Sequence, residues 1–269
     1  MVERSLRCAR RHTFDIARHG YVNLAGRAPS DNADDQDMVR ARAEFLDAGH
    51  YAPLAEHLGV LAARVGGGDG LVLDAGAGTG YYLAAVLDCL PDAAGLAMDV
   101  STYALRRAAR AHQRAGAVGW DVWRPLPVRD GALSVLLNVF APRNSVEFCR
   151  VLAPDGALIV VTPTDDHLAE LVNAMRLLSV DARKRQRLDQ TLSADFRLDA
   201  TTVLRTPLTL SPPDVLRAAA MGPSARHVPA EELRRRAHAV DAPLRTTASF
   251  TVSVYRRRRA GVAERKGGR

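Results

Sequence analysis

The sequence predicts an α/β protein whose core is a mostly parallel sheet of seven strands. Apolar strand-like runs alternate with helix-periodic runs through the middle of the chain, as parallel strand pairing requires. A glycine-rich turn joins the first of these strands to the helix that follows it, and such sheets bind nucleotides at this turn. The 269 residues are enough for one large domain and a small appendage.

The predicted elements follow one another in a regular order. Two amphipathic helices come first, at 38–46 and 51–65, and three glycines end the second. Strands are predicted at 71–73, 94–99, 117–122, 133–140 and 157–162, with helices at 82–89, 102–113 and 146–152 and a turn at 154–156. A helix follows at 167–178, and then strands at 201–210 and 248–255 with helices at 212–220 and 230–240 between them.

The two ends of the chain differ in composition from this core. Residues 1–24 are too few to fold alone without a metal or a larger neighbour. Residues 25–37 are rich in Gly, Pro, Ser, Asn and Asp, which is typical of a linker. We therefore expect an N-terminal appendage and linker over 1–37, a main domain over 38–255 and a disordered basic tail over 256–269.

The net charge and the cysteine count limit the classes of protein that this chain can belong to. The net charge of +7 comes mostly from arginine, which suits bidentate phosphate contact. A polyanionic partner and a G+C-rich coding sequence both explain this bias, so the charge alone leaves both open. Three scattered cysteines support no disulfide framework, and no apolar run approaches the roughly 20 residues that cross a bilayer. With no secretory signal, we expect a cytoplasmic protein without a membrane contact.

The glycine turn identifies the nucleotide. The strand ends at Asp74 and is followed by Gly76-x-Gly78-x-Gly80. In a dinucleotide site the third glycine comes three residues after the second, whereas here it comes after two. This pattern resembles motif I of class I Rossmann-like methyltransferases, whose loop packs against the amino-acid part of S-adenosylmethionine. The resemblance implies a cofactor site at Asp74, Gly76, Gly78 and Gly80.

Two further carboxylates follow in the order expected of that fold. Asp99 ends the second strand, where a carboxylate can accept both ribose hydroxyls of the cofactor. Asp121 follows the third strand and is placed like the acid that contacts the adenine amino group, although a solvated loop acid would look the same. The predicted turn at 154–156 matches the proline-glycine turn before the fifth strand of that fold.

A narrower resemblance covers residues 6–255. The motifs Cys8-x-x-x-His12-Thr-Phe-Asp and Phe45-Leu-Asp-x-Gly-His-Tyr51 are similar to those of the RlmA/TlrB family of 23S rRNA guanine-N1 methyltransferases. Further matching blocks begin at Gly80, Leu96, Asn138, Thr162 and Met221. The block Asn138-Val-Phe-Ala-Pro-Arg143 resembles the Gram-positive branch, which is associated with macrolide resistance.

The resemblance implies roles for individual residues. The S-adenosylmethionine site would be lined by Tyr51, Tyr82, Leu83, Asp99, Val100 and His167. Two of these residues have an alternative interpretation. Tyr51 could be an ordinary core aromatic, and His167 could simply lie near the first turn of its helix. Either Asn138 or the backbone of 140–142 would orient the guanine, and Phe140 would stack on it. Asp165 and Asp166 follow the fifth strand, where they would act as a base or simply cap the next helix.

The N-terminal appendage resembles the family's zinc module only in part. That module uses four ligands, and Cys8 and His12 match its second pair, but no cysteine precedes Cys8. Either the start codon lies inside the true reading frame, or this branch has lost the finger. Two ligands bind zinc weakly, so we expect a remnant zinc-ribbon-like module that takes zinc only when it is completed, with a structural Cys8 and a surface His12.

The resemblance also implies the partners. A 23S rRNA hairpin would contact Arg7, Arg10, Arg11, Arg18 and the segment 183–187, and the family precedent suggests a homodimer. A small-molecule methyltransferase is one alternative, but it gives no use to the arginines of the appendage. A non-catalytic relative that binds both S-adenosylmethionine and RNA is the other, and it predicts cofactor binding without turnover.

Overall fold

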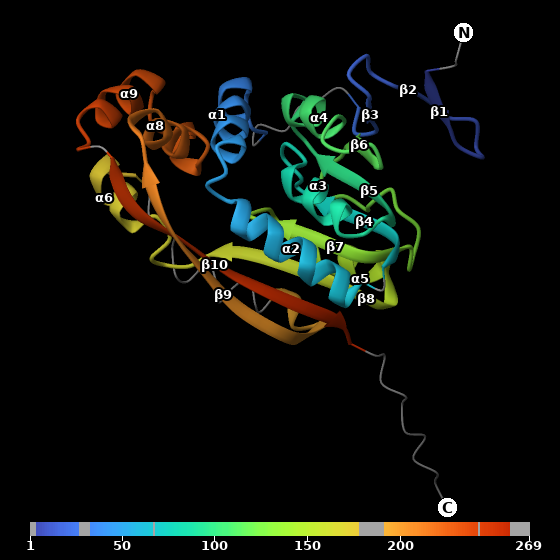
Figure 1. Ribbon diagram of the computed structural model, residues 1–269. Coiled ribbons are helices and arrows are strands. Elements are labelled where there is room, and N and C mark those ends of the chain that lie inside the picture. The colour runs from blue at the N-terminus through green and yellow to red at the C-terminus, as the bar shows by residue number, and fades with distance from the viewer. Residues whose placement is uncertain (1–3, 27–32, 67, 178–190, 242, 259–269) are drawn as a thin grey trace, which may run out of the picture.

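The computed structural model describes residues 4–26, 33–66, 68–177, 191–241 and 243–258 (Figure 1). Eight strands form its central sheet in the order β3-β6-β5-β4-β7-β8-β10-β9. Neighbours from β3 to β8 are parallel, whereas β10 is antiparallel to both β8 and β9. The strands are β3 Tyr21–Asn23, β4 Asp69–Ala75, β5 Asp92–Asp99, β6 Ala115–Gly119, β7 Leu133–Val139, β8 Leu152–Pro163, β9 Phe196–Leu210 and β10 Leu244–Arg257.

The helices cover both faces of the sheet and gather at one of its edges. One apolar core contains residues of α1 to α4, α6, α8 and α9. A second core, on the other face, packs α5 against residues of β7 and β8. The parallel strands point toward the side of the molecule where α1, α8 and α9 lie (Figure 1). The helices are α1 Gln36–Asp47, α2 Ala52–Val65, α3 Tyr81–Asp88, α4 Thr102–Ala108, α5 Ser145–Val151, α6 Ala169–Met175, α8 Pro212–Ala220 and α9 Ala230–His238, with the short 3₁₀ helix η1 at Pro223–Arg226.

The predicted fold class is confirmed, with two corrections. The sheet has eight strands rather than seven because Tyr21–Asn23, predicted as part of the appendage, pairs in parallel with β6. The predicted turn at 154–156 lies inside β8. The pairing of β7 with β8 skips from Leu152 to Ala157, so the intervening residues form a bulge rather than a break.

The appendage is a small unit beside α4. Its hairpin of β1 Ser5–Arg7 and β2 Thr13–Asp15 lies outside the main sheet, while β3 joins the sheet edge (Figure 1). Gly20 allows the chain to turn at φ +96° and to approach the Ala109 Cβ atom beside α4. The segment 183–187 and the tail from 259 lie outside the described residues, and no described helix is long and apolar enough to cross a membrane.

Candidate cofactor and substrate site

The glycine loop between β4 and α3 is shaped by close backbone approach. Gly76 has φ +84°, and a Cβ atom there would lie 2.4 Å from the Ala141 Cβ atom. Gly80 has φ +80°, and a Cβ atom there would lie 2.9 Å from the Ala111 Cβ atom. A side chain at either position would clash with these alanines. It would also have to adopt the left-handed backbone conformation that favours glycine. The loop therefore presents bare backbone at the carboxyl edge of the sheet.

Asp99 fixes this loop from the end of the neighbouring strand. One carboxylate oxygen accepts a hydrogen bond from the Gly78 N–H group at 2.8 Å, and the other accepts from the Ser101 N–H group at 2.8 Å. Burial raises the pKa of Asp99, and the two N–H donors oppose that rise. Each oxygen keeps further acceptor capacity. The carboxylate is thus positioned as a ribose anchor would be.

Asp74 carries a buried carboxyl group at the end of β4. It is 1% exposed, and neither of its oxygens has a hydrogen-bond partner among the described residues. Burial, with the nearby charge of Asp99, raises its pKa to about 8. An unsatisfied buried carboxyl group is costly, and a cationic or donor group placed beside it would remove that cost. The amino group of S-adenosylmethionine provides such a donor, so Asp74 fits the cofactor.

Tyr51 and His167 are brought together from distant parts of the chain. The Tyr51 hydroxyl lies 3.1 Å from the His167 Nε2 atom, and the Ser249 N–H group donates to the His167 Nδ1 atom at 3.1 Å. Burial lowers the pKa of His167 to about 4, so its ring is neutral at pH 7. Because Nδ1 accepts, Nε2 carries the proton and donates to the tyrosine oxygen. The Tyr51 hydroxyl proton is then available to another acceptor.

Three of the other predicted cofactor residues occupy different environments. Tyr82 is buried at the start of α3, and burial raises its pKa well above the ordinary value. Leu83 is 1% exposed and lies against Gly95 of β5, so only its backbone N–H group can face a ligand. Val100 is half-buried directly after Asp99.

The predicted substrate residues meet where β7 ends. Asn138 is fully buried and donates from its amide nitrogen to the backbone oxygens of Ala75 and Pro142, at 3.2 and 2.8 Å. It therefore ties the glycine strand to the 140–142 loop, which favours that loop over the Asn138 side chain as the group that faces a substrate. Phe140 is 44% exposed with φ +55° and packs against Phe250 of β10, with ring centroids 5.4 Å apart.

The remaining acidic candidates divide by their partners. The Asp166 carboxylate pairs with Arg205 at 2.5 Å and accepts from the Thr164 hydroxyl, and its pKa is lowered. Asp166 is therefore a poor base. Asp165 is exposed in the same turn between β8 and α6. Asp121 accepts a hydrogen bond from the Trp123 N–H group at 3.0 Å and so caps the turn after β6.

The predicted metal pair, Cys8 and His12, lies in the hairpin between β1 and β2. The Cys8 Sγ and His12 Nδ1 atoms are 3.5 Å apart, and both residues are exposed. Within the described ranges, no group of three or more His, Cys, Asp or Glu residues could hold a metal ion. Two donors do not make the closed tetrahedral set of a structural zinc site, so the residues described do not fit zinc.

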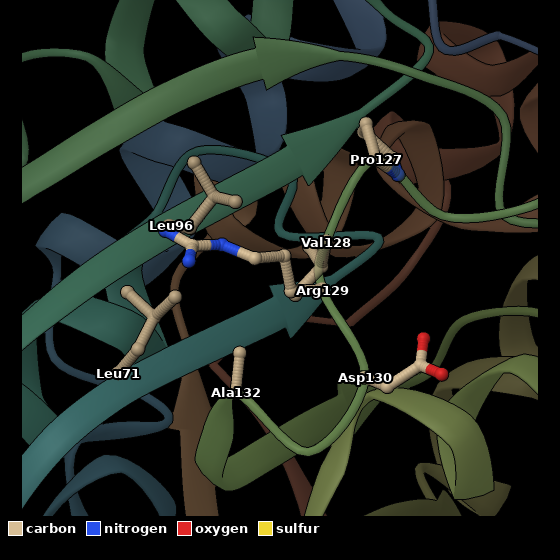
Figure 2. Close-up of a pocket in the computed structure, with 7 residues that line it drawn as sticks. All are labelled: Leu71, Leu96, Pro127, Val128, Arg129, Asp130 and Ala132. Atoms are coloured by element: carbon tan, nitrogen blue, oxygen red, sulfur yellow. The ribbon is translucent and has the colours of Figure 1, made fainter.

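A hollow of about 450 Å³ lies on the sheet, but it is not this site. It is lined by Leu71, Leu96 and the loop residues Pro127, Val128, Arg129, Asp130 and Ala132, none of which belongs to the predicted set. Figure 2 shows Arg129 extending over Leu96 while Asp130 points away from it. Asp130 pairs instead with Arg150 at 2.6 Å.

Comparison with known proteins agrees with this geometry. Residues 2–25 match the zinc-ribbon family model described as RlmA, N-terminal. The chain is 50% identical over 256 residues to the 23S rRNA (guanine(748)-N(1))-methyltransferase of Streptomyces fradiae, covering 94% of this chain and 91% of that protein. A Micromonospora griseorubida protein named for guanine N1 of 23S rRNA is 51% identical over 268 residues, covering 94% and 90%.

The chain belongs to the 23S rRNA (guanine-N1)-methyltransferase family. This membership confirms the predicted resemblance, the predicted methyl-transfer activity and S-adenosylmethionine as the cofactor. The YcgJ protein of Bacillus subtilis shares the fold, with a TM-score of 0.52 and 14% identity over 76% of this chain and 99% of that one.

The structure of this methyltransferase adds residues that the sequence did not indicate. Arg42 of α1 lies beside Gly78, forms an ion pair with Asp34 and donates to the Met221 oxygen at 2.9 Å. Asp34 also pairs with Arg226 at 2.7 Å, so the segments before α1 and after α8 are joined over the glycine loop. Phe250 contacts the rings of Tyr51, His167 and Phe140. Nothing local in the sequence marks these residues as part of the site.

Proposed function

We propose that this methyltransferase transfers a methyl group to N1 of a guanine in a hairpin of 23S rRNA. The observation that carries the proposal is Phe140, a large aromatic side chain held exposed on a strained backbone beside the glycine loop. Strain of this kind persists only where the surrounding structure enforces it, and it concentrates at functional sites. An exposed ring at this edge fits stacking on a base that is turned out of its helix.

The cofactor residues divide the work of binding. Gly76, Gly78 and Gly80 would accommodate the amino-acid part of S-adenosylmethionine, with the Asp74 carboxyl group facing its amino group and Asp99 its ribose. The backbone N–H groups of Tyr82 and Leu83 at the start of α3 suit its carboxylate. Tyr51 and His167 would complete the site, and Val100 and Asp121 would flank the adenosine. When bound, S-adenosylmethionine supplies a sulfonium methyl group that is already activated for transfer.

The protein must then position the nucleophile and accept one proton. Guanine N1 carries a proton at neutral pH, so an acceptor has to lie close to it. Asn138 fixes the 140–142 loop through two hydrogen bonds, and the backbone oxygens of this loop are candidate acceptors. Asp165 is the candidate side-chain base because it follows β8 at the carboxyl edge of the sheet, where ligands bind.

The wider organisation follows from the family. We keep the predicted division into an N-terminal module with linker (1–37), a methyltransferase domain (38–255) and a basic tail (256–269), but we move its two boundaries. Helix α1 already begins at Gln36 and β10 continues to Arg257, so the domain covers 36–257. The names of the relatives support 23S rRNA as the substrate. The family resemblance alone supports action in the cytoplasm, a homodimer that frames the RNA, and macrolide resistance as the outcome of methylation.

One experiment tests the proposal directly. The protein is incubated with methyl-labelled S-adenosylmethionine and an unmodified 23S rRNA transcript, and the product is mapped by primer extension. A methyl group on N1 blocks Watson–Crick pairing, so reverse transcription should stop at a single guanine. Label in small molecules but not in RNA would overturn the proposal. Cofactor binding without any transfer would favour the non-catalytic alternative.

A pair of variants tests the role of Phe140. Phe140→Ala should lower kcat by about 10-fold or more while leaving the dissociation constant of S-adenosylmethionine within about twofold, because the ring faces the substrate. Leu198→Ala removes another exposed apolar side chain, from β9, and should change neither quantity. Equal kcat values in the two variants would contradict base stacking by Phe140.

A further inference from the structure

Four side chains that carry or can carry positive charge converge where the N-terminal module meets α4. Arg18 and His19 lie in the turn between β2 and β3, while Arg106 lies on α4 and Arg110 directly after it. Gly20 lies against the Ala109 Cβ atom, so the two segments are neighbours in space. The Arg18 Nε atom is 3.2 Å from the His19 Nε2 atom, and the Arg110 Nη2 atom is 3.1 Å from His19 Nδ1. We call these four residues the α4 cluster.

The described residues give the α4 cluster no acidic partner. A neutral imidazole has one acceptor nitrogen, so at most one of the two arginines makes a full hydrogen bond to His19. Within the described ranges, Arg18, Arg106 and Arg110 form no ion pair with a carboxylate. Burial, and then the charges of Arg18, Arg110 and Arg106, lower the pKa of His19.

Arginines elsewhere in the molecule show the contrast. Arg150 pairs with Glu147 and Asp130, and Arg217 pairs with Asp214 and Glu44. The cluster therefore differs from an ordinary solvated face, on which cations and acids are mixed. Like charges held within hydrogen-bond distance of one ring are stabilised by an anion placed between them.

Aromatic rings accompany the cluster. The Arg106 guanidinium group lies 5.0 Å from the centre of the Tyr103 ring, which is 37% exposed. A second such pair, Arg124 over Trp120 at 4.3 Å, lies after β6, and Arg124 donates to the Ala25 oxygen at the end of the module. Tyr103 is exposed and Trp120 is half-buried. Arginine beside accessible aromatic rings is typical of surfaces that bind single-stranded nucleic acid.

We propose that the α4 cluster binds the phosphate backbone of the RNA substrate, so that the N-terminal module and the methyltransferase domain form one docking surface. The inference rests on the proposed function for the identity of the RNA. Phosphate contacts carry no sequence information, so the cluster contributes affinity and orientation while the edge near Phe140 selects the base.

The test uses two charge-matched double variants. Arg106→Ala with Arg110→Ala removes two cations of the cluster, and Arg234→Ala with Arg235→Ala removes two exposed cations of α9, which pair with Glu231 and Glu232. Binding of the 23S rRNA transcript is measured by filter retention between about 50 and 200 mM KCl. The dissociation constant of S-adenosylmethionine and the unfolding temperature are measured alongside and should match the wild type in both variants.

The expected result is a weaker complex and a shallower salt dependence for the cluster variant. Its RNA dissociation constant should rise at least about 10-fold, and its log–log salt slope should fall by about 1 to 2, with the α9 variant unchanged. An unrelated RNA of equal length should lose affinity by the same factor. Equal salt slopes in the two variants, or a loss confined to 23S rRNA, would overturn the inference. Failure of the wild type to methylate guanine N1 would overturn the proposed function. The comparison of RNA binding between the two variants would still test the α4 cluster, because it does not depend on methyl transfer.

Discussion

The cofactor edge, where β4, β5 and β7 end, buries its polar side chains, whereas the N-terminal module exposes them. At the edge, Asp74, Tyr51 and His167 are largely buried and their pKa values are shifted. In the module, Cys8, His12 and Arg18 are exposed. Burying polar groups is costly unless a ligand uses them, whereas exposed cations cost little until a partner arrives. The comparison separates a buried edge, where we propose that the methyl group is transferred, from an exposed surface, which we propose contacts the RNA.

The close packing around Gly76 predicts the largest effect on cofactor binding. Gly76→Ala should weaken S-adenosylmethionine binding by at least about 100-fold, or ~3 kcal/mol, because its Cβ atom would overlap Ala141 at a left-handed backbone position. Gly68→Ala is the control, since it has φ +88° but open space around it. Calorimetric titration measures both. Equal losses would show that backbone strain rather than the close approach is responsible.

The buried His167 predicts a loss of stability in acid. Its folded pKa of about 4 lies below the ordinary value of 6.5, so its contribution is present above pH 6.5 and is lost as the pH falls toward 4. Between pH 7 and pH 5 this costs about 2 kcal/mol of the free energy of unfolding. His167→Asn keeps an acceptor for the Ser249 N–H group and should remove this part of the pH dependence. Urea unfolding at the two pH values checks it, and an unchanged dependence would place the titrating group elsewhere.

The Tyr51 hydroxyl predicts a smaller effect on the same edge. Tyr51→Phe should raise the S-adenosylmethionine dissociation constant by about 10-fold, or ~1.4 kcal/mol, because the ligand loses the hydrogen bond that the Tyr51 hydroxyl would donate to it. Tyr81→Phe removes a neighbouring half-buried hydroxyl and should leave the affinity within about twofold. Equal affinity in the two variants would make Tyr51 an ordinary core aromatic.

Asp74 predicts a gain of stability at the expense of binding. Its folded pKa of about 8 lies above the ordinary 3.8, so its carboxyl group costs stability as the pH rises from 3.8 toward 8. Asp74→Asn should raise the unfolding temperature at pH 8 by about 3 °C, or ~1 kcal/mol, and weaken S-adenosylmethionine binding. Thermal unfolding with and without cofactor measures both. A lower unfolding temperature without cofactor would mean that the carboxyl group has a stabilising partner.

The exposed module predicts the smallest effect. Cys8→Ser should change the free energy of unfolding by less than ~0.5 kcal/mol, and a metal chelator should leave the unfolding temperature of the wild type unchanged. The reason is that Cys8 and His12 alone bind zinc weakly. A lower unfolding temperature after chelation would show that zinc is bound through further ligands. The module would then be stabilised by a metal and would not differ from the edge in this way.

The sequence predicted much of the edge because its signals are local. The Gly76, Gly78 and Gly80 spacing, the Asp99 position and the alternation of strands and helices each depend on a few neighbouring residues. Helix α8 was predicted at its observed bounds for the same reason. The family motifs placed Tyr51 and His167 in one site, and the structure brings them within hydrogen-bond distance.

Other parts depended on pairings that no local pattern encodes. Asn138 was expected to face the substrate on one interpretation, but tertiary packing buries it and uses its amide group to hold two loops. The three residues of β3 became an eighth strand because β6 offered an open edge. Phe250 joined the aromatic group because β10 inserts beside β8 from far along the chain.

The sequence by itself determined the fold class, the glycine loop and the family, because backbone periodicity and motif spacing are properties of contiguous residues. Only the tertiary structure decided how Arg42, Asp34 and Arg226 join over the loop, and how Arg18 and His19 meet Arg106 and Arg110. Those contacts link residues up to 192 positions apart. Their charges are visible in the sequence, but their neighbours are set by chain packing.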